Sequence, residues 1–147
     1  MEGLRELFQG FARNFSMLDG ACCARCCGED LSLIQSHILF EIRRRDLPSM
    51  QEVAGALGID VATFSRQIKT LVEKGFVQTT PDTNDGRVKL LSLTPAGAEV
   101  EGQINDFMER AIRRILDQMS PFEQNSVLSS LALLNKAVRD ADIWSRE

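Results

Sequence analysis

The sequence predicts a mainly helical fold that contains a single two-stranded hairpin. Most of its 147 residues fall into segments whose apolar side chains recur every three or four positions, the spacing of one helix face. Several of these segments follow a Ser, Thr or Asp, which is typical of a helix start. A polar stretch over residues 81–86 separates two short apolar segments and indicates a hairpin turn.

The first part of the chain is predicted to form two helices. The first covers residues 4–19, with an apolar face made of Leu4, Leu7, Phe8, Phe11, Phe15 and Leu18. Gly20 and a group of cysteines interrupt this pattern, and residues 28–30 are expected to form a loop. Ser32 then caps a second helix over residues 33–45. Its inner face is expected to comprise Leu33, Ile34, His37, Ile38 and Ile42.

A pair of short helices is predicted next. Ser49 caps the first of them and Gly58 ends it, and Asp60 caps the second, which covers residues 61–74. The inner face of the second short helix is expected to comprise Val61, Phe64, Ile68, Leu71 and Val72. Two short helices joined by a tight, Gly-containing turn form the helix-turn-helix pattern, in which the second helix enters the major groove of DNA.

The remaining segments predict a wing and two more helices. Residues 76–80 and 87–93 are expected to pair as the strands of the hairpin. Thr94 then opens a long helix that reaches about Met119, and Ser120 opens the last helix. The apolar stripe of that last helix consists of Phe122, Val127, Leu128, Leu131, Leu134 and Val138.

These elements predict one winged helix-turn-helix lobe with dimerisation helices on either side of it. The lobe is expected over residues 32–97, and the dimerisation helices over residues 1–31 and 98–147. The terminal helices carry more apolar surface than the small lobe can cover, which favours a homodimer. The alternative is a monomer in which the terminal helices pack on each other.

The outward face of the second short helix predicts contacts with double-stranded DNA. It is small, hydroxylated and basic, and the predicted contacts on it are Thr63, Ser65, Arg66, Lys69 and Thr70. Arg66 suits a guanine edge, whereas Lys69 suits a backbone phosphate. Residues 61–90 carry five basic and three acidic side chains, a net charge of +2 in a chain whose total is −4. The alternative is a solvated helix face beside an ordinary hairpin.

The stretch over residues 53–77, VAGALGIDVATFSRQIKTLVEKGFV, resembles the core of the MarR family of winged-helix transcription regulators. Two further motifs are similar to that family: Asp85-Gly86-Arg87 in the wing and Leu91-Ser92-Leu93-Thr94-Pro95-Ala96-Gly97 after it. The motifs run from about Leu31 to Gly97, and the flanking helices agree in order and length.

This resemblance implies a homodimer whose first and last helices interlock, with two recognition helices in successive major grooves of a pseudo-palindromic operator. It also implies that Arg87 enters the minor groove, that Asp85 orients it, and that Lys89 contacts a phosphate. The function expected is transcriptional regulation, as a repressor that an effector releases. Gly86 departs from the family pattern, which often has more basic residues beside the wing arginine.

Four cysteines, Cys22, Cys23, Cys26 and Cys27, lie within six residues. If this segment is helical, cysteines four positions apart lie one turn apart, too far for a disulfide without unwinding but near enough for thiolates to share a soft ion. Three interpretations stay open: a soft metal or metalloid site, a switch that oxidants act on, or buried apolar residues without a signalling role. No cofactor is expected to be required. The resemblance to the MarR family implies a small aromatic or lipophilic effector as the alternative signal.

Other classes of protein fit the sequence less well. No apolar run is long enough to cross a bilayer and the N-terminus lacks a signal-peptide pattern, so a cytoplasmic protein is expected. With one His, no Tyr and no phosphate-binding loop, the chain is not expected to be an enzyme. The rival hypothesis is a cysteine-based redox or metal-transfer enzyme. It is disfavoured because the cysteines do not lie in a predicted strand–loop–helix segment, the arrangement of thiol redox sites. A winged helix used only for protein contact is a third possibility.

Overall fold

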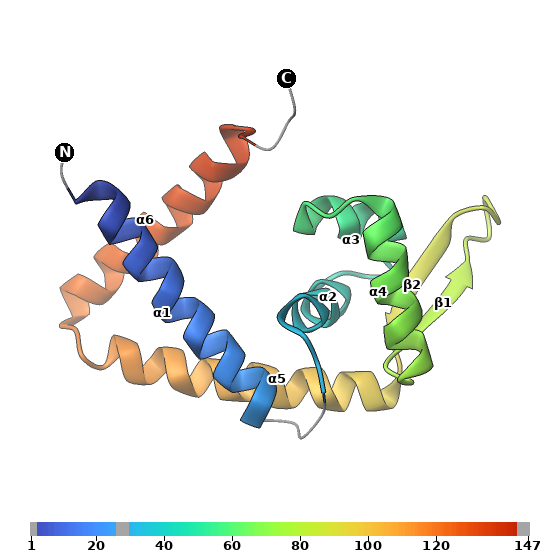
Figure 1. Cartoon of the computed structure of the whole chain (residues 1–147), viewed down its shortest axis with the longest axis horizontal. Coiled ribbons are helices and arrows are strands. Elements are labelled where there is room, and N and C mark those ends of the chain that lie inside the picture. The colour runs from blue at the N-terminus through green and yellow to red at the C-terminus, as the bar shows by residue number, and fades with distance from the viewer. Residues whose placement is uncertain (1–2, 26–29, 144–147) are drawn as a thin grey trace. The chain divides into compact units, whose positions relative to one another are not determined.

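The computed structural model describes residues 3–25 and 30–143 of the chain, and Figure 1 shows its elements. Two compact units divide the chain, over Met1–Met108 and Glu109–Glu147. The elements are, in order, α1 (Leu4–Arg25), α2 (Leu33–Arg44), α3 (Met50–Leu57), α4 (Val61–Glu73), β1 (Val77–Pro81), β2 (Lys89–Leu93), α5 (Pro95–Leu116) and α6 (Pro121–Asp140). The predicted mainly helical fold with a two-stranded hairpin is confirmed.

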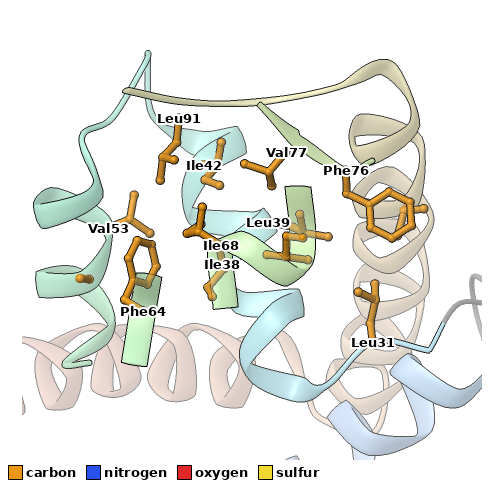
Figure 2. Close-up of a cluster of buried hydrophobic side chains, with 13 residues drawn as sticks. Leu31, Ile38, Leu39, Ile42, Val53, Phe64, Ile68, Phe76, Val77 and Leu91 are labelled. Atoms are coloured by element: carbon orange, nitrogen blue, oxygen red, sulfur yellow. The ribbon is translucent and has the colours of Figure 1, made fainter. Parts of the chain in front are cut away.

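The hydrophobic core of the first unit lies where α2, α3, α4 and the hairpin meet. Figure 2 shows its side chains pointing toward one another from these elements. Fully buried members include Ile38, Leu39, Val53, Phe64, Leu71 and Leu91. Because burial of each such side chain stabilises the fold by about 1.5–3 kcal/mol, this cluster fixes α4 on its inner side and leaves its other side to solvent.

Local capping sets where the helices begin. Ser32, Asp60 and Ser120 each accept a hydrogen bond from the backbone amide three residues later, so the predicted caps of α2, α4 and α6 are confirmed. Between α3 and α4, Gly58 adopts the left-handed conformation, with φ 65° and ψ 31°. A glycine reaches this conformation without strain, and the sharp turn that results directs α4 away from α3.

The hairpin is an antiparallel pair in which Val77 lies opposite Leu93 and Pro81 opposite Lys89. It is joined to the segment just before α3, because the amide of Leu91 donates to the carbonyl of Pro48 at 2.8 Å. The strands begin later than the sequence predicted, and Arg87 lies in the turn rather than in the second strand. The cause is a closed turn in which the amide of Val88 donates to the carbonyl of Asp85 at 2.9 Å.

Two expectations about the helices were wrong. Helix α1 continues through Gly20 to Arg25, since one helical glycine costs only about 1 kcal/mol relative to alanine. The inner faces of α2 and α4 were also misplaced, because four residues expected inside are exposed: Leu33, His37, Val61 and Val72. In α2 the buried set contains Gln35 and Glu41, so polar residues occupy inner positions and the apolar pattern misleads.

The second unit consists of the end of α5, a short turn and α6. Gln124 joins its two helices by donating to the carbonyls of Leu116 at 2.9 Å and Met119 at 3.1 Å. None of the described residues of α6 is buried. Large apolar side chains are therefore left uncovered on this unit, among them Phe122, Leu128, Leu133, Leu134 and Val138.

Within the described residues, no helix is both long and apolar enough to span a membrane.

Gly97, on α5, lies in close contact with the backbone of Phe76. A Cβ atom at this position would overlap the carbonyl group of Phe76, whereas one at Gly102 on the same helix meets open space. We expect Gly97→Ala to lower the free energy of unfolding by about 1–3 kcal/mol, because backbone has to move. Gly102→Ala is the matched control and should raise it by about 0.5–1 kcal/mol. Urea denaturation measures the free energy of unfolding of both variants. Equal changes in the two variants would contradict the close contact between Gly97 and the backbone of Phe76.

Candidate nucleic-acid interface

The start of α4 holds an arginine in place through a chain of side-chain hydrogen bonds. The hydroxyl of Thr63 donates to Asp60 Oδ2 at 2.7 Å, and Arg66 Nη2 donates to the same hydroxyl at 3.2 Å. The hydroxyl and amide of Thr63 lower the pKa of Asp60 below its ordinary value, and the charge of Arg66 adds to this effect. Asp60 is therefore ionised at neutral pH, and Arg66 lies exposed over the first turn of the helix.

The other predicted contacts on α4 differ in exposure. Ser65 and Lys69 are exposed, whereas Thr63 and Thr70 are half-buried. Thr70 donates its hydroxyl to the carbonyl of Arg66 at 3.2 Å, so its proton is directed into its own helix and only the oxygen lone pairs face outward. Ser65, Arg66 and Lys69 thus form an exposed hydroxylated and basic part of α4, and the exposed surface of the helix also includes Val61, Val72 and Glu73.

The wing ends in a compact turn that presents Arg87. The side chain of Arg87 is 96% exposed, and its Nε lies 3.5 Å from Asp85 Oδ1, which also accepts from the backbone amide of Arg87 at 3.1 Å. The amide of Asp82 closes the turn by donating to the carbonyl of Val88 at 2.8 Å. Asp85 therefore faces the exposed guanidinium of Arg87 as its ion-pair partner.

A hollow of about 440 Å³ separates α4 from the hairpin. Lys69 of α4 and Lys89 of β2 both line this hollow, so one basic residue of the helix and one of the wing lie beside the same hollow. The full lining is Met50, Ser65, Ile68, Lys69, Val72, Glu73, Thr79 and Lys89. Sequence reasoning missed Met50 and Thr79, because only the folded arrangement brings them beside α4.

The cysteines are described only in part. Cys22 and Cys23 belong to the last turn of α1, whereas Cys26 and Cys27 lie outside the described residues. Cys22 is 1% exposed and its thiol donates to the carbonyl of Ile104 on α5 at 3.8 Å. Among residues 3–25 and 30–143, no three His, Cys, Asp or Glu side chains form a group that could hold a metal ion. His37, expected in the core, is exposed on α2.

Comparison with known proteins gives a consistent result. The model of the MarR family matches residues 31–89. The transcriptional regulator AdcR of Streptococcus pneumoniae is 25% identical over 134 residues, which cover 89% of each chain. FabT of S. pneumoniae, solved in complex with DNA, superposes with a TM-score of 0.86 at 20% identity over 95% of this chain and 97% of that one. Apo MarR from Escherichia coli has a TM-score of 0.71 at 23% identity, over 94% and 98%. Residues 31–89 thus match the MarR family, and the chain shares its fold with FabT and MarR.

Proposed function

We propose that the protein binds double-stranded DNA sequence-specifically as a homodimer and represses transcription until an effector releases it. The observation that carries this proposal is the meeting of Lys69 and Lys89 at one hollow, with Arg66 exposed on the helix and Arg87 on the wing. A duplex needs positive charge along a continuous surface, which a helix and an adjoining hairpin supply together. FabT, which shares the fold, was solved with DNA bound.

Each exposed side chain suits one kind of DNA contact. Arg66 and Ser65 lie on the part of α4 that would enter the major groove, where a guanidinium binds the guanine edge with two hydrogen bonds. Lys69 and Lys89 are placed to contact backbone phosphates on either side of the hollow. Arg87, which Asp85 orients, reaches from the wing toward the minor groove, whose negative potential favours arginine.

The homodimer is supported by uncovered apolar side chains in both units. In α1, Leu4, Leu7, Phe8 and Phe11 are all exposed, at helical spacing. In the second unit, exposed apolar residues recur along the whole of α6. Apolar surface of this extent is rare on monomers and is the usual basis of a symmetric dimer, so a second copy of the chain is the expected partner.

Two kinds of effector fit the chain. A soft metal ion, metalloid or oxidant would act at Cys22, Cys23, Cys26 and Cys27. Since Cys22 is buried against α5, its reaction requires the end of α1 to separate from α5, which supplies a physical link between signal and structure. A small aromatic or lipophilic ligand is the alternative, and in that case the cysteines are structural.

The test is a selection of duplexes from a random pool with the wild-type protein, followed by titration of the selected duplex. We expect Kd to rise by about 10³-fold or more between 50 and 200 mM salt if six or more phosphates are contacted. Titrations with Cd²⁺, hydrogen peroxide or an aromatic acid then identify the releasing signal. Failure to select any sequence, or an affinity that salt does not change, would overturn the proposal and favour a lobe used for protein contact.

A further inference from the structure

The recognition helix α4 is tied by two side-chain hydrogen bonds to residues 30–35, here termed the α1–α2 junction. Gln67, near the middle of α4, accepts from Gln35 Nε2 at 3.2 Å. Lys74, the C-cap of α4, donates from Nζ to the backbone carbonyl of Asp30. Both bonds join segments more than 30 residues apart in sequence, and neither belongs to the apolar core.

The amide of Gln35 is held so that its donor faces α4. Its Oε1 accepts from the backbone amide of Ser32 at 3.1 Å, while its own backbone amide donates to Ser32 Oγ at 3.2 Å. These reciprocal bonds form the capping box of α2, and they fix which end of the amide points outward. Rotation of the amide by 180° would break the cap and the bond to Gln67 together, so the buried Gln35 is a rigid donor.

Two attachment points restrict α4 in addition to its apolar packing. Gln67 and Lys74 are seven residues apart, which is about 10 Å along a helix. Apolar contacts are non-directional and tolerate small rotations, whereas a hydrogen bond requires a narrow range of geometry. A rotation of about 15° moves a side-chain end that lies about 6 Å from the helix axis by roughly 1.5 Å, enough to break a contact to a base edge.

We propose that the α1–α2 junction positions the recognition helix for sequence-specific binding, through Gln35, Gln67 and Lys74 as positioning residues. The inference rests on the proposed DNA binding, and it adds that the α1–α2 junction sets the rotation of α4 about its axis. Any change that moves Asp30 or uncaps α2 at Ser32 alters the rotation of α4, and with it the alignment of Ser65 and Arg66. Selectivity among DNA sequences depends on this alignment, whereas attraction to phosphates does not.

The test compares Gln67→Met with the control Gln103→Met, which changes an exposed glutamine on α5. Methionine matches glutamine in length but lacks the amide. The probes are the duplex selected with wild-type protein and a scrambled duplex of the same composition. We expect Gln67→Met to raise Kd for the selected duplex about tenfold and to leave Kd for the scrambled duplex unchanged. The selectivity ratio, defined as Kd for the scrambled duplex divided by Kd for the selected duplex, should therefore fall about tenfold. A merely structural role would lower the urea midpoint and leave this selectivity ratio unchanged.

Lys74 supplies a second, independent arm. Lys74→Met should lower the selectivity ratio as well. Lys74→Arg, which keeps a donor for the carbonyl of Asp30, should keep the selectivity ratio at its wild-type value. Wild-type ratios for both Gln67→Met and Lys74→Met, in a protein that still discriminates the selected duplex, would overturn the positioning role and leave DNA binding intact. A wild-type protein that does not discriminate the two duplexes would overturn both proposals.

Discussion

Arg87→Ala is expected to weaken binding of the selected duplex on the order of 100-fold while the free energy of unfolding stays unchanged. The side chain is 96% exposed and contributes to no packing, so its removal costs the fold nothing. A groove-inserted arginine contributes about 1–3 kcal/mol to discrimination, and a homodimer would lose two of them. Competition titration against the scrambled duplex, together with urea denaturation, measures both quantities.

The control for this variant is Arg139→Ala, which removes an exposed arginine from α6 and the same charge from the chain. It should leave Kd within about twofold of the wild-type value, because Arg139 is none of the residues proposed to contact DNA. Asp85→Asn gives an intermediate case, since it keeps an oxygen that accepts from the amide of Arg87 but removes the charge facing the guanidinium. If Arg87→Ala and Arg139→Ala bind alike, the wing takes no part in recognition.

The features that sequence predicted best are local ones. The caps Ser32, Asp60 and Ser120 each bond to an amide three residues away, so the residue type and the following pattern are enough to locate them. The same holds for the turn at Gly58 and for the hairpin. These local signals place the exposed residues of α4, whereas the resemblance to the MarR family singles out the wing arginine Arg87.

The features that sequence missed depend on contacts between distant segments. Gln35 is buried on α2 and bonds to Gln67 of α4, a partner that no periodicity of apolar residues reveals. Glu41 is buried as well, but its partners are Arg44 and Arg45, three and four residues away. The prediction of His37 as a core residue was also wrong, because His37 is exposed on α2. The hollow beside α4 and the bond between Lys74 and Asp30 likewise exist only once the chain has folded. Hydrogen bonds and ion pairs between residues far apart in sequence are thus the features that the sequence pattern does not predict.

The ion pair of Arg43 with Glu101 is the clearest case of such pairing. It links α2 to α5 across 58 positions of sequence, and the side chain of Glu101 is 1% exposed whereas that of Arg43 is 49% exposed. Arg43→Met should therefore leave a buried carboxylate without its cation and lower the free energy of unfolding by about 2–4 kcal/mol. The estimate lies toward the lower end of the range for buried pairs, because water reaches one partner.

The matched control is Arg44→Met, on the next residue of the same helix. Arg44 and Arg45 both bond to Glu41, so removal of Arg44 leaves that carboxylate with Arg45 Nε at 3.0 Å. The loss should stay within about 1 kcal/mol, as for an exposed pair. The double variant Arg43→Met with Glu101→Leu should recover most of the loss, because no buried charge remains. Equal urea midpoints for Arg43→Met and Arg44→Met would mean that Glu101 does not depend on Arg43 in solution.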